Sequence, residues 1–397
     1  MAGKSPLPGI AAGMRRHPAL FRAGRRAFRV ARGLPAAVSR ALFPSSGSFG
    51  PARGFFSGIG MVGRGEVRGE VILESQRCPG FPDGSLVRLS GLSQDREQPW
   101  PVFWMEMPGA LLTGSTLCPR NKRGEILAEA TFSRQGDRND PAFGHFAKGR
   151  FARVEGNATS LVSRWGGDTS GNKRHGGAGY WHWLMDSVSR LSLMDRFPED
   201  TRVITPVLAP WMAWFLDELG LSDRIIQTEA RGIRVENFYF SSPSSMTGCW
   251  NPMAVSFLRE RFLGKASARA FPRRFYILRE GFTRRVLNDD EVREFFESRG
   301  WALVAPERLS IPDQIALFSG AEAVAGLHGS AFTNLLWSAP GSAVIELVPH
   351  NFLSGAFEWL ARMNRMRHDF LICPADHRSN ITVDLGLLES RLRASGM

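Results

Sequence analysis

Cysteine is scarce in this sequence, and long apolar runs are absent. The 397-residue chain has four cysteines at widely separated positions, with no CxxC pair. This pattern argues against a structural zinc site and a disulfide framework, and it favours a reducing compartment. No apolar run approaches the roughly 18 residues that a membrane-spanning helix needs, and no signal-peptide core is evident. We therefore expect the body of the protein to be soluble.

Familiar nucleotide-binding and hydrolase signatures are missing as well. No GxGxxG spacing follows a predicted strand, and the sequence has no P-loop lysine motif and no Gly-x-Ser-x-Gly elbow. A nicotinamide dehydrogenase is therefore a poor fit. Metal ligands are too few, because His182 and Asp186 do not complete a site and Asp289 and Asp290 suit the first turn of a helix. The sequence predicts no metal and no other cofactor.

Acidic residues are missing from the first 40 positions, which hold nine positive charges. The formal net charge of the whole chain is +12, so most of the excess belongs to this segment and the remainder is nearly balanced. A nucleic-acid partner would have to use these N-terminal arginines, with affinity that falls steeply as salt rises. The balanced remainder argues against such a partner.

The N-terminal segment has the pattern of an amphipathic helix. On a helical wheel of residues 20–34 the apolar side chains occupy one half, and the other half carries five arginines, Arg22, Arg25, Arg26, Arg29 and Arg32. This separation predicts that residues 14–42 lie on an anionic membrane surface. A transit peptide and a solvated basic arm are the alternatives.

The length suggests about two domains with extensions. We expect a basic amphipathic segment at 1–45, a linker at 46–60, an N-terminal α/β domain at 61–245 and a C-terminal Rossmann-like domain at 250–397. In the last of these, strands alternate with helices, which predicts a doubly wound parallel sheet. The predicted strands are Phe275–Leu278, Ala302–Ala305, Ala323–Gly326, Ala343–Val348 and His368–Ile372. A capping box formed by Asn288 and Glu291 is expected to open the helix between the first two.

The stretch Glu322–His350 is the centre of the prediction. It forms a strand, a Leu-His-Gly turn, a short helix with Ser330 placed to cap it, and a second strand. The unpaired N–H groups of the helix and its dipole would face an anion such as a diphosphate. The alternative is an ordinary turn of an α/β protein, with His328 a simple turn residue.

Charged residues in the C-terminal half could complete an anion site. Arg279 ends a strand, and Arg284 and Arg285 follow in the next loop, where guanidinium groups could neutralise a diphosphate. A solvated arginine loop is the alternative. Glu346 interrupts an apolar run, where a carboxylate is costly without partners. We interpret it as an acceptor for both hydroxyls of a ribose; an exposed edge residue is the alternative.

A second group lies in the predicted helix Tyr180–Phe197, directly after the glycine-rich loop 171–179. His182 and Asp186 are spaced i, i+4, so the carboxylate can orient the imidazole as a general base. The aromatic residues Tyr180, Trp181 and Trp183 could stack on sugar rings. The alternative is that this histidine is a core residue.

The segments YWHWLMD, FYILRE, RRVLNDDEV, HGSAFTN and VIEL, in this order and spacing, resemble glycosyltransferase family 61 over roughly residues 165–350. The resemblance implies a GT-B architecture, with two Rossmann-like domains facing a central cleft. It also implies inverting, metal-independent transfer from a nucleotide-sugar, usually a UDP-sugar, by a hexosyl- or pentosyltransferase. Bacterial relatives act in capsular or other surface polysaccharide synthesis.

The resemblance assigns provisional roles. His182 and Asp186 would be catalytic, and Tyr180, Trp181 and Trp183 would bind a polysaccharide or glycolipid acceptor. The donor would contact Arg279, Arg284, Arg285, His328, Gly329, Ser330, Asn334 and Glu346. Eukaryotic relatives carry a membrane anchor where this chain has a basic helix, which favours a cytoplasmic enzyme peripheral at the inner membrane. A non-catalytic nucleotide-sugar-binding or membrane-associated scaffold is the alternative function.

Overall fold

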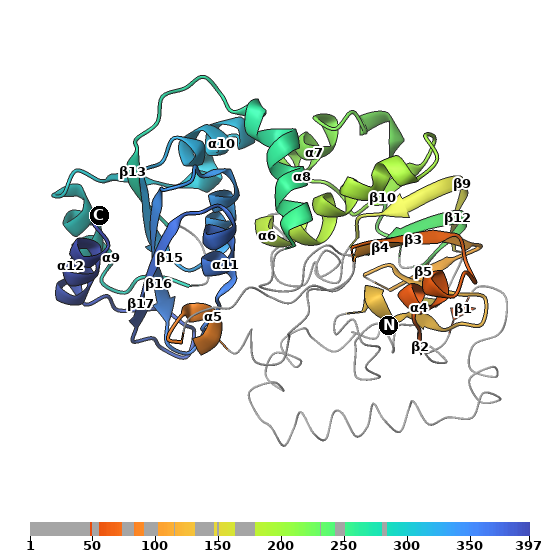
Figure 1. Ribbon diagram of the computed structural model, residues 1–397, viewed down its shortest axis with the longest axis horizontal. Coiled ribbons are helices and arrows are strands. Elements are labelled where there is room, and N and C mark those ends of the chain that lie inside the picture. The colour runs from red at the N-terminus through yellow and green to blue at the C-terminus, as the bar shows by residue number, and fades with distance from the viewer. Residues whose placement is uncertain are drawn as a thin grey trace, which may run out of the picture.

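A computed structural model describes residues 48–49, 55–73, 83–90, 102–114, 116–131, 147–148, 151–162, 179–230, 232–242, 251–279 and 284–397. The predicted amphipathic segment 14–42 and the glycine-rich loop up to residue 178 lie outside them. Within the described residues, no helix is long and apolar enough to cross a membrane. Figure 1 shows two sheets at opposite ends of the molecule, with helices between them.

The C-terminal sheet has five parallel strands in the order β14-β13-β15-β16-β17. Their bounds are Ala302–Val304 for β14, Arg274–Ile277 for β13, Ala323–Leu327 for β15, Ala343–Pro349 for β16 and Arg367–Cys373 for β17. All five predicted strands are confirmed, with ends that differ by one residue. The α/β fold class is therefore confirmed, whereas the two-domain GT-B arrangement stays a prediction.

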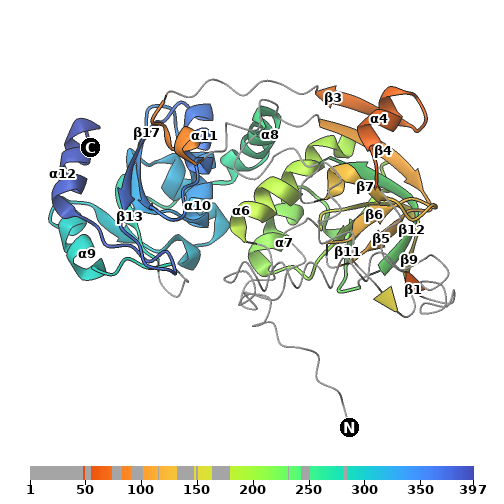
Figure 2. The same cartoon turned by 90° about the horizontal axis from the view of Figure 1, so that it is seen from below.

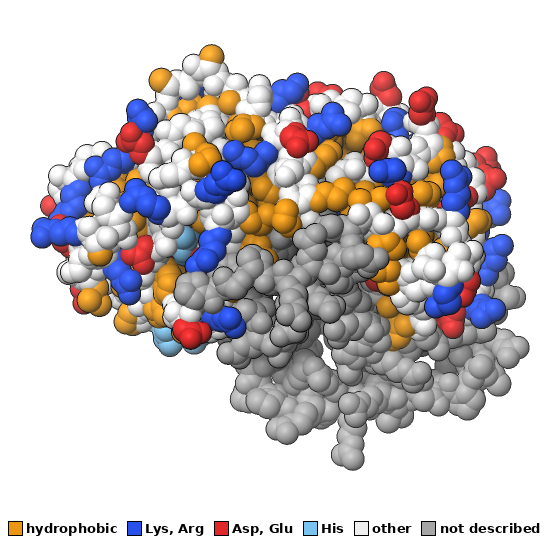
Figure 3. Space-filling view, viewed as in Figure 1, with side chains coloured by type: hydrophobic (Ala, Val, Ile, Leu, Met, Phe, Trp, Pro, Cys, Tyr) orange, Lys and Arg blue, Asp and Glu red, His pale blue; other side chains and the backbone are white. Residues whose placement is uncertain are grey.

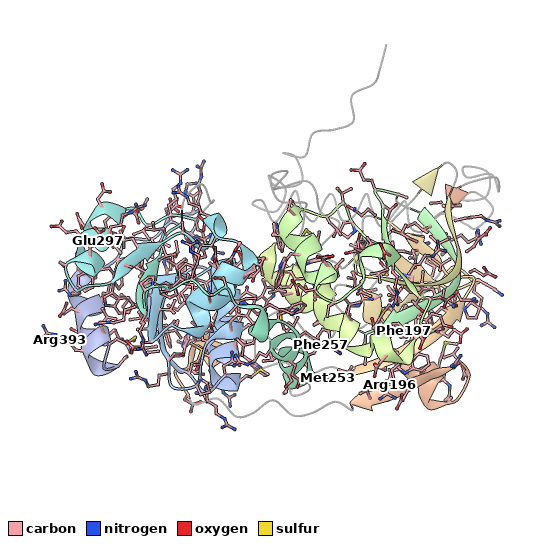
Figure 4. The ribbon with its side chains drawn as sticks, turned by 90° about the horizontal axis from the view of Figure 1, so that it is seen from above. Arg196, Phe197, Met253, Phe257, Glu297 and Arg393 are labelled. Atoms are coloured by element: carbon pink, nitrogen blue, oxygen red, sulfur yellow. The ribbon has the colours of Figure 1, made fainter. Side chains whose placement is uncertain are left out.

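Helices cover both faces of this sheet, which is why β15 and β16 are buried along their whole length. On one face lie α9 (Asp289–Glu297) and α12 (Leu385–Ala394), and on the other lie α10 (Ile311–Ser319), η8 (Ser330–Trp337) and α11 (Ala356–Met363). Figure 4 shows Glu297 of α9 and Arg393 of α12 on the outer side, away from the second sheet. The 3₁₀ turns η6 (Leu263–Lys265) and η7 (Pro306–Arg308) complete the connections.

The strand order creates a topological switch point at the carboxyl ends of β13 and β15. The chain passes from β13 to β14 on one side and from there to β15 on the other, so the connections diverge between these two neighbours. Ligands of open α/β sheets bind at such a switch point. It lies between Arg279, two residues after β13, and the His328–Gly329 turn after β15.

The second sheet has ten strands and mixed pairing. Its central strand β12 pairs in parallel with β9, and antiparallel with both β4 and β5. Parallel pairing continues from β9 to β10 and β11. The bounds are Phe55–Phe56 (β2), Gly69–Leu73 (β3), Val102–Pro108 (β4), Leu111–Thr113 (β5), Cys118–Arg120 (β6), Ile126–Leu127 (β7), Ala152–Ser160 (β9), Arg202–Thr205 (β10), Ile225–Gln227 (β11) and Gly232–Ser241 (β12). Strands β1 (Ser48–Phe49) and β8 (Ala147–Lys148) form a separate pair.

A helical layer lies between the sheets. It contains α6 (Tyr180–His182), the π-helical turn η3 (Trp183–Ser187), the 3₁₀ helix η4 (Val188–Arg196), α7 (Pro210–Asp217) and α8 (Pro252–Phe262). Figure 4 shows Met253 and Phe257 of α8 in this layer, near Phe197 at the end of η4. One hydrophobic cluster joins Trp183, Phe262 and Trp337. The core therefore continues across the predicted division between residues 245 and 250.

A short helix of the N-terminal half crosses to the C-terminal sheet. Helix α5 (Leu86–Leu89) lies beside α11 in both ribbon views (Figures 1 and 2). The buried carboxylate of Glu358 accepts a hydrogen bond of 2.9 Å from the backbone N–H of Val87. Residues 83–90 therefore pack with the C-terminal sheet, although the predicted boundaries assign them to the N-terminal domain.

Gly355→Ala is expected to loosen this attachment. An added Cβ would lie 2.6 Å from Cγ2 and 2.7 Å from the backbone nitrogen of Val87. We expect a loss of about 1–3 kcal/mol in unfolding free energy and faster hydrogen exchange in residues 83–90. Gly264→Ala is the control, because its Cβ would meet nothing within 4 Å. Unchanged exchange in the Gly355 variant would contradict the close packing.

The expected capping box at Asn288 is wrong, although α9 begins where predicted. The Asn288 side chain makes no cap hydrogen bond to the first turn. Its amide instead donates to the carbonyl of Val383 and accepts from the Val383 N–H, at 3.0 and 2.9 Å. Asn288 thus ties the start of α9 to the segment before α12.

Candidate functional site

His182 and Asp186 form the pair that their spacing predicts. The Nδ1 atom of His182 lies 2.8 Å from a carboxylate oxygen of Asp186. The Asp186 side chain is buried, whereas that of His182 is 25% exposed. Asp186 lies in the π-helical turn η3, a rare feature that is frequent at functional sites. The geometry suits a base whose imidazole a carboxylate orients through Nδ1, and the catalytic role itself stays a prediction.

Arg190 supports this pair from inside the protein. Its guanidinium is buried and donates from Nε to the carbonyl of Ser241 at 2.9 Å. Burial lowers the pKa of Arg190 to about 10, and the negative charge of Asp186 opposes this shift. Arg190 therefore remains charged at neutral pH and favours the ionised form of Asp186.

The three aromatic residues around His182 occupy the core. Trp183 is fully buried, and Trp181 is 8% exposed with its ring 5.3 Å from that of Phe357. Tyr180 is half-buried and packs edge-on against Trp211. This burial gives them a packing role, so the predicted stacking on acceptor sugars receives no support from their positions.

Asn334, predicted to bind the donor, is fully buried and bonded to three side chains. Its side-chain oxygen accepts from the hydroxyl of Tyr180 at 2.8 Å and from the indole of Trp337 at 3.0 Å. Its amide donates to Gln314 at 2.9 Å. Asn334 therefore links α6 to the helices of the C-terminal sheet, and a donor contact stays a prediction that this geometry disfavours.

Glu346 lies at the centre of a second buried group. One carboxylate oxygen is hydrogen-bonded to Nδ1 of His328, and the other lies 3.0 Å from Nε2 of His368. Glu346 is 0% exposed, so the alternative of an exposed edge residue is wrong. Because both oxygens are occupied, the structure favours an orienting role over the predicted ribose contact, which stays untested.

The charge of Glu346 is maintained by its partners. Burial by itself would raise the pKa of Glu346, but the positive charges and hydrogen bonds of His328 and His368 outweigh it and lower that pKa to about 2. The carboxylate is therefore ionised at neutral pH. It fixes the Nδ1 side of the His328 ring, which leaves Nε2 for a ligand.

Two guanidinium groups lie beside His328. Arg279 donates from Nη1 to the His328 carbonyl at 3.3 Å, and Arg284 lies over the ring of Phe352 at 4.3 Å. Burial lowers the pKa of Arg279 to about 10, and the nearby charge of Arg284 acts in the same direction. The Nη1 atom of Arg284 is buried without a hydrogen-bond partner among the described residues. This concentration of positive charge suits an anionic ligand.

The positions of Arg285 and Ser330, which neighbour these groups, differ from the sequence prediction. Arg285 is exposed, with its backbone paired to Asn380 and Ile381, so only Arg284 of the two faces the group. Gly329, not Ser330, is the N-cap of η8, and no side chain caps this helix. The predicted cap at Ser330 is therefore wrong.

Position 329 requires glycine because the structure leaves no room for a side chain there. Its φ of 172° is ordinary extended backbone. A Cβ at this position would overlap Nη1 of Arg279 and lie 2.7 Å from its Cζ. The guanidinium of Arg279 can therefore lie on the turn only because residue 329 has no side chain.

Aromatic rings connect the two groups. The ring of Phe357 lies 5.0 Å from that of His328 and 5.3 Å from that of Trp181, the neighbour of His182. Sequence reasoning missed Phe357 and His368. Both lie on predicted elements, but neither has a motif of its own, and their roles depend on strand register and helix packing.

A glycine motif elsewhere in the chain does not form a nucleotide site. The spacing Gly58-x-Gly60-x-x-Gly63 lies in helix α4 (Gly58–Gly63), directly after β2, so the prediction that no GxGxxG spacing follows a strand is wrong. The buried carboxylate of Glu129 already accepts from the N–H groups of Gly58 and Ile59, at 3.0 and 3.3 Å. A Cβ at Gly58 would also collide with Met105. These glycines therefore allow the backbone to pack closely around the buried carboxylate of Glu129.

Surface charge and metal ligands give no further site. On the face seen in Figure 3, Lys and Arg side chains are dispersed and mixed with Asp and Glu. In the part of the chain that the structure describes, no group of three or more His, Cys, Asp or Glu residues could hold a metal ion. The metal-independent mechanism stays a prediction.

Comparison with known proteins gives one family match. Residues 180–345 match the model of the family Glycosyltransferase 61, which is less than half of the 397-residue chain. The match begins at Tyr180 and ends directly before Glu346, so it includes the His182 pair, Arg279 and the His328 turn. A search of curated proteins found no match. The family match supports a glycosyltransferase, with a nucleotide-sugar donor and an acceptor as substrates.

Proposed function

We propose that this protein is an inverting glycosyltransferase that moves a sugar from a UDP-sugar to a hydroxyl of a polysaccharide or glycolipid. The observation that carries the proposal is the group of Arg279, Arg284 and His328 at the switch point of the C-terminal sheet. Buried positive charge there fits the diphosphate of a nucleotide-sugar, the donor class that the family match supports.

In this proposal the C-terminal group stabilises the leaving diphosphate. The guanidinium groups of Arg279 and Arg284 neutralise its charge, and Nε2 of His328 donates a hydrogen bond to one of its oxygens. Glu346 holds the other side of the ring. Donors fixed in advance contribute several kcal/mol to transition-state stabilisation, so no metal is needed to absorb the charge.

His182 is the proposed base. In its neutral form Nδ1–H donates to Asp186, and Nε2 takes the proton of the acceptor hydroxyl. The acceptor oxygen forms a bond to the anomeric carbon while the bond to the diphosphate oxygen breaks with its electron pair. One displacement inverts the configuration, and Asp186 stabilises the imidazolium that results.

The cellular setting is part of the same proposal. The basic segment 14–42 would hold the enzyme at the cytoplasmic face of the inner membrane, where surface polysaccharide precursors are assembled. Arginine near an anionic bilayer contributes about 1 kcal/mol of attraction per residue.

Nucleotide binding tests the proposal. We expect UDP to raise the melting temperature much more than uridine, because the diphosphate supplies the contacts, with GDP and CMP as competitors. Arg284→Gln is expected to lower UDP affinity about tenfold, whereas Arg285→Gln, at an exposed position, stays within about twofold. Equal effects of UDP and uridine would contradict the proposal. UDP binding without UDP release from any donor and acceptor would favour the scaffold alternative.

A further inference from the structure

His368 is a buried titratable residue that the proposed mechanism does not use. It lies on β17, opposite Val344 of β16. Because alternate residues of a strand share a face, Glu346 lies two positions further along on the same face of the sheet. The side chain of His368 is 3% exposed, so it is too deeply buried to touch a substrate.

His368 completes the hydrogen bonding of Glu346. The carboxylate has two oxygens, and each meets a different imidazole, Nδ1 of His328 and Nε2 of His368 at 3.0 Å. The terminal torsion of a glutamate is broad and holds no fixed angle by itself. A partner on each oxygen fixes the plane of the carboxylate, and this plane sets the orientation of the His328 ring.

An ionised carboxylate only accepts hydrogen bonds, so each imidazole donates to Glu346. His328 donates from Nδ1 and His368 from Nε2. Asp369 follows His368 in sequence, but it bonds to Ser395 and to Arg391 of α12.

We propose that His368 is a positioning residue, which holds Glu346 so that His328 presents Nε2–H to the diphosphate of the donor. This inference rests on the proposed function for its ligand, but the orientation of His328 can be measured without any ligand. Both Glu346 and His368 lie beyond the stretch that matches the family model.

Two substitutions of His368 distinguish a positioning role of this residue from a packing role. His368→Leu fills the space without a donor, whereas His368→Gln places an amide N–H near the position of Nε2. The exposed residue His377 provides the control His377→Gln. The full chain, labelled with ¹⁵N-histidine, reports the His328 Nδ1–H signal, which is assigned by its loss in His328→Gln. UDP affinity, kcat and melting temperature are measured on the same samples.

We expect His368→Leu to shift or abolish the His328 signal, and to weaken UDP affinity and kcat about tenfold each. His368→Gln is expected to restore the signal and both constants to within about threefold, and His377→Gln to match the parent protein. An unchanged His328 signal in His368→Leu overturns the inference, as do equal losses in both His368 variants, which indicate packing alone. If the parent protein binds no UDP but the signal follows this pattern, the proposed function fails while the positioning role is supported.

Discussion

His182→Ala is expected to lower kcat by about 10²–10⁴-fold while the affinity for UDP stays within about twofold. The imidazole is partly exposed and paired with buried Asp186, so its loss removes the proton acceptor and leaves Arg279, Arg284 and His328 intact. Single-turnover transfer and calorimetric titration with UDP measure the two quantities separately.

Asp186→Asn sharpens this test of the base. The amide oxygen can still accept from Nδ1 of His182, but it lacks the charge that stabilises the imidazolium. We expect kcat to fall, but by less than in His182→Ala, because the imidazolium then forms without its counter-charge. Loss of UDP binding in His182→Ala would remove His182 from the base role.

Gly329→Ala is expected to weaken UDP binding by about 10–100-fold with little change in stability. The added Cβ occupies the position of Nη1 of Arg279, so the guanidinium must leave the turn. The flexible arginine side chain can move, which is why we expect the cost to fall on ligand affinity. Gly264→Ala, whose Cβ meets nothing within 4 Å, is the matched control.

A double-mutant cycle isolates the cause of this effect. In an Arg279→Ala background, Gly329→Ala should add almost nothing to the loss of UDP affinity, because the side chain that collides is already absent. Additive losses would show that residue 329 acts independently of Arg279, for example through direct approach of the backbone to the ligand.

The two sheets differ in how far their sequences predicted them. The C-terminal strands alternate with helices along the chain, and this local order is enough to specify five parallel neighbours. In the other sheet, β12 pairs with β4 more than 120 positions earlier in the chain. Such pairing leaves no local signal, and β9, with the polar sequence ARVEGNATS, lacks the apolar alternation of a strand.

The candidate site also combines features that the sequence predicted with features that it did not. Spacing alone placed His182 and Asp186 together, because one helical turn brings residues i and i+4 into contact. Chain order likewise placed Arg279 and the His328 turn at one end of a parallel sheet. The sequence could not predict the direction in which side chains point. Trp181, Trp183 and Asn334 were predicted to contact ligands, but they are core residues.

The sequence by itself therefore determined the parallel C-terminal sheet, the His182 pair and the position of the anion turn, because each depends on short-range periodicity. Only the tertiary structure decided that Glu346 bonds to two histidines, that Arg284 and not Arg285 faces the site, and that Gly329 makes room for Arg279. These contacts depend on the register between strands and on the packing of residues 18 to 50 positions apart, which no local pattern records.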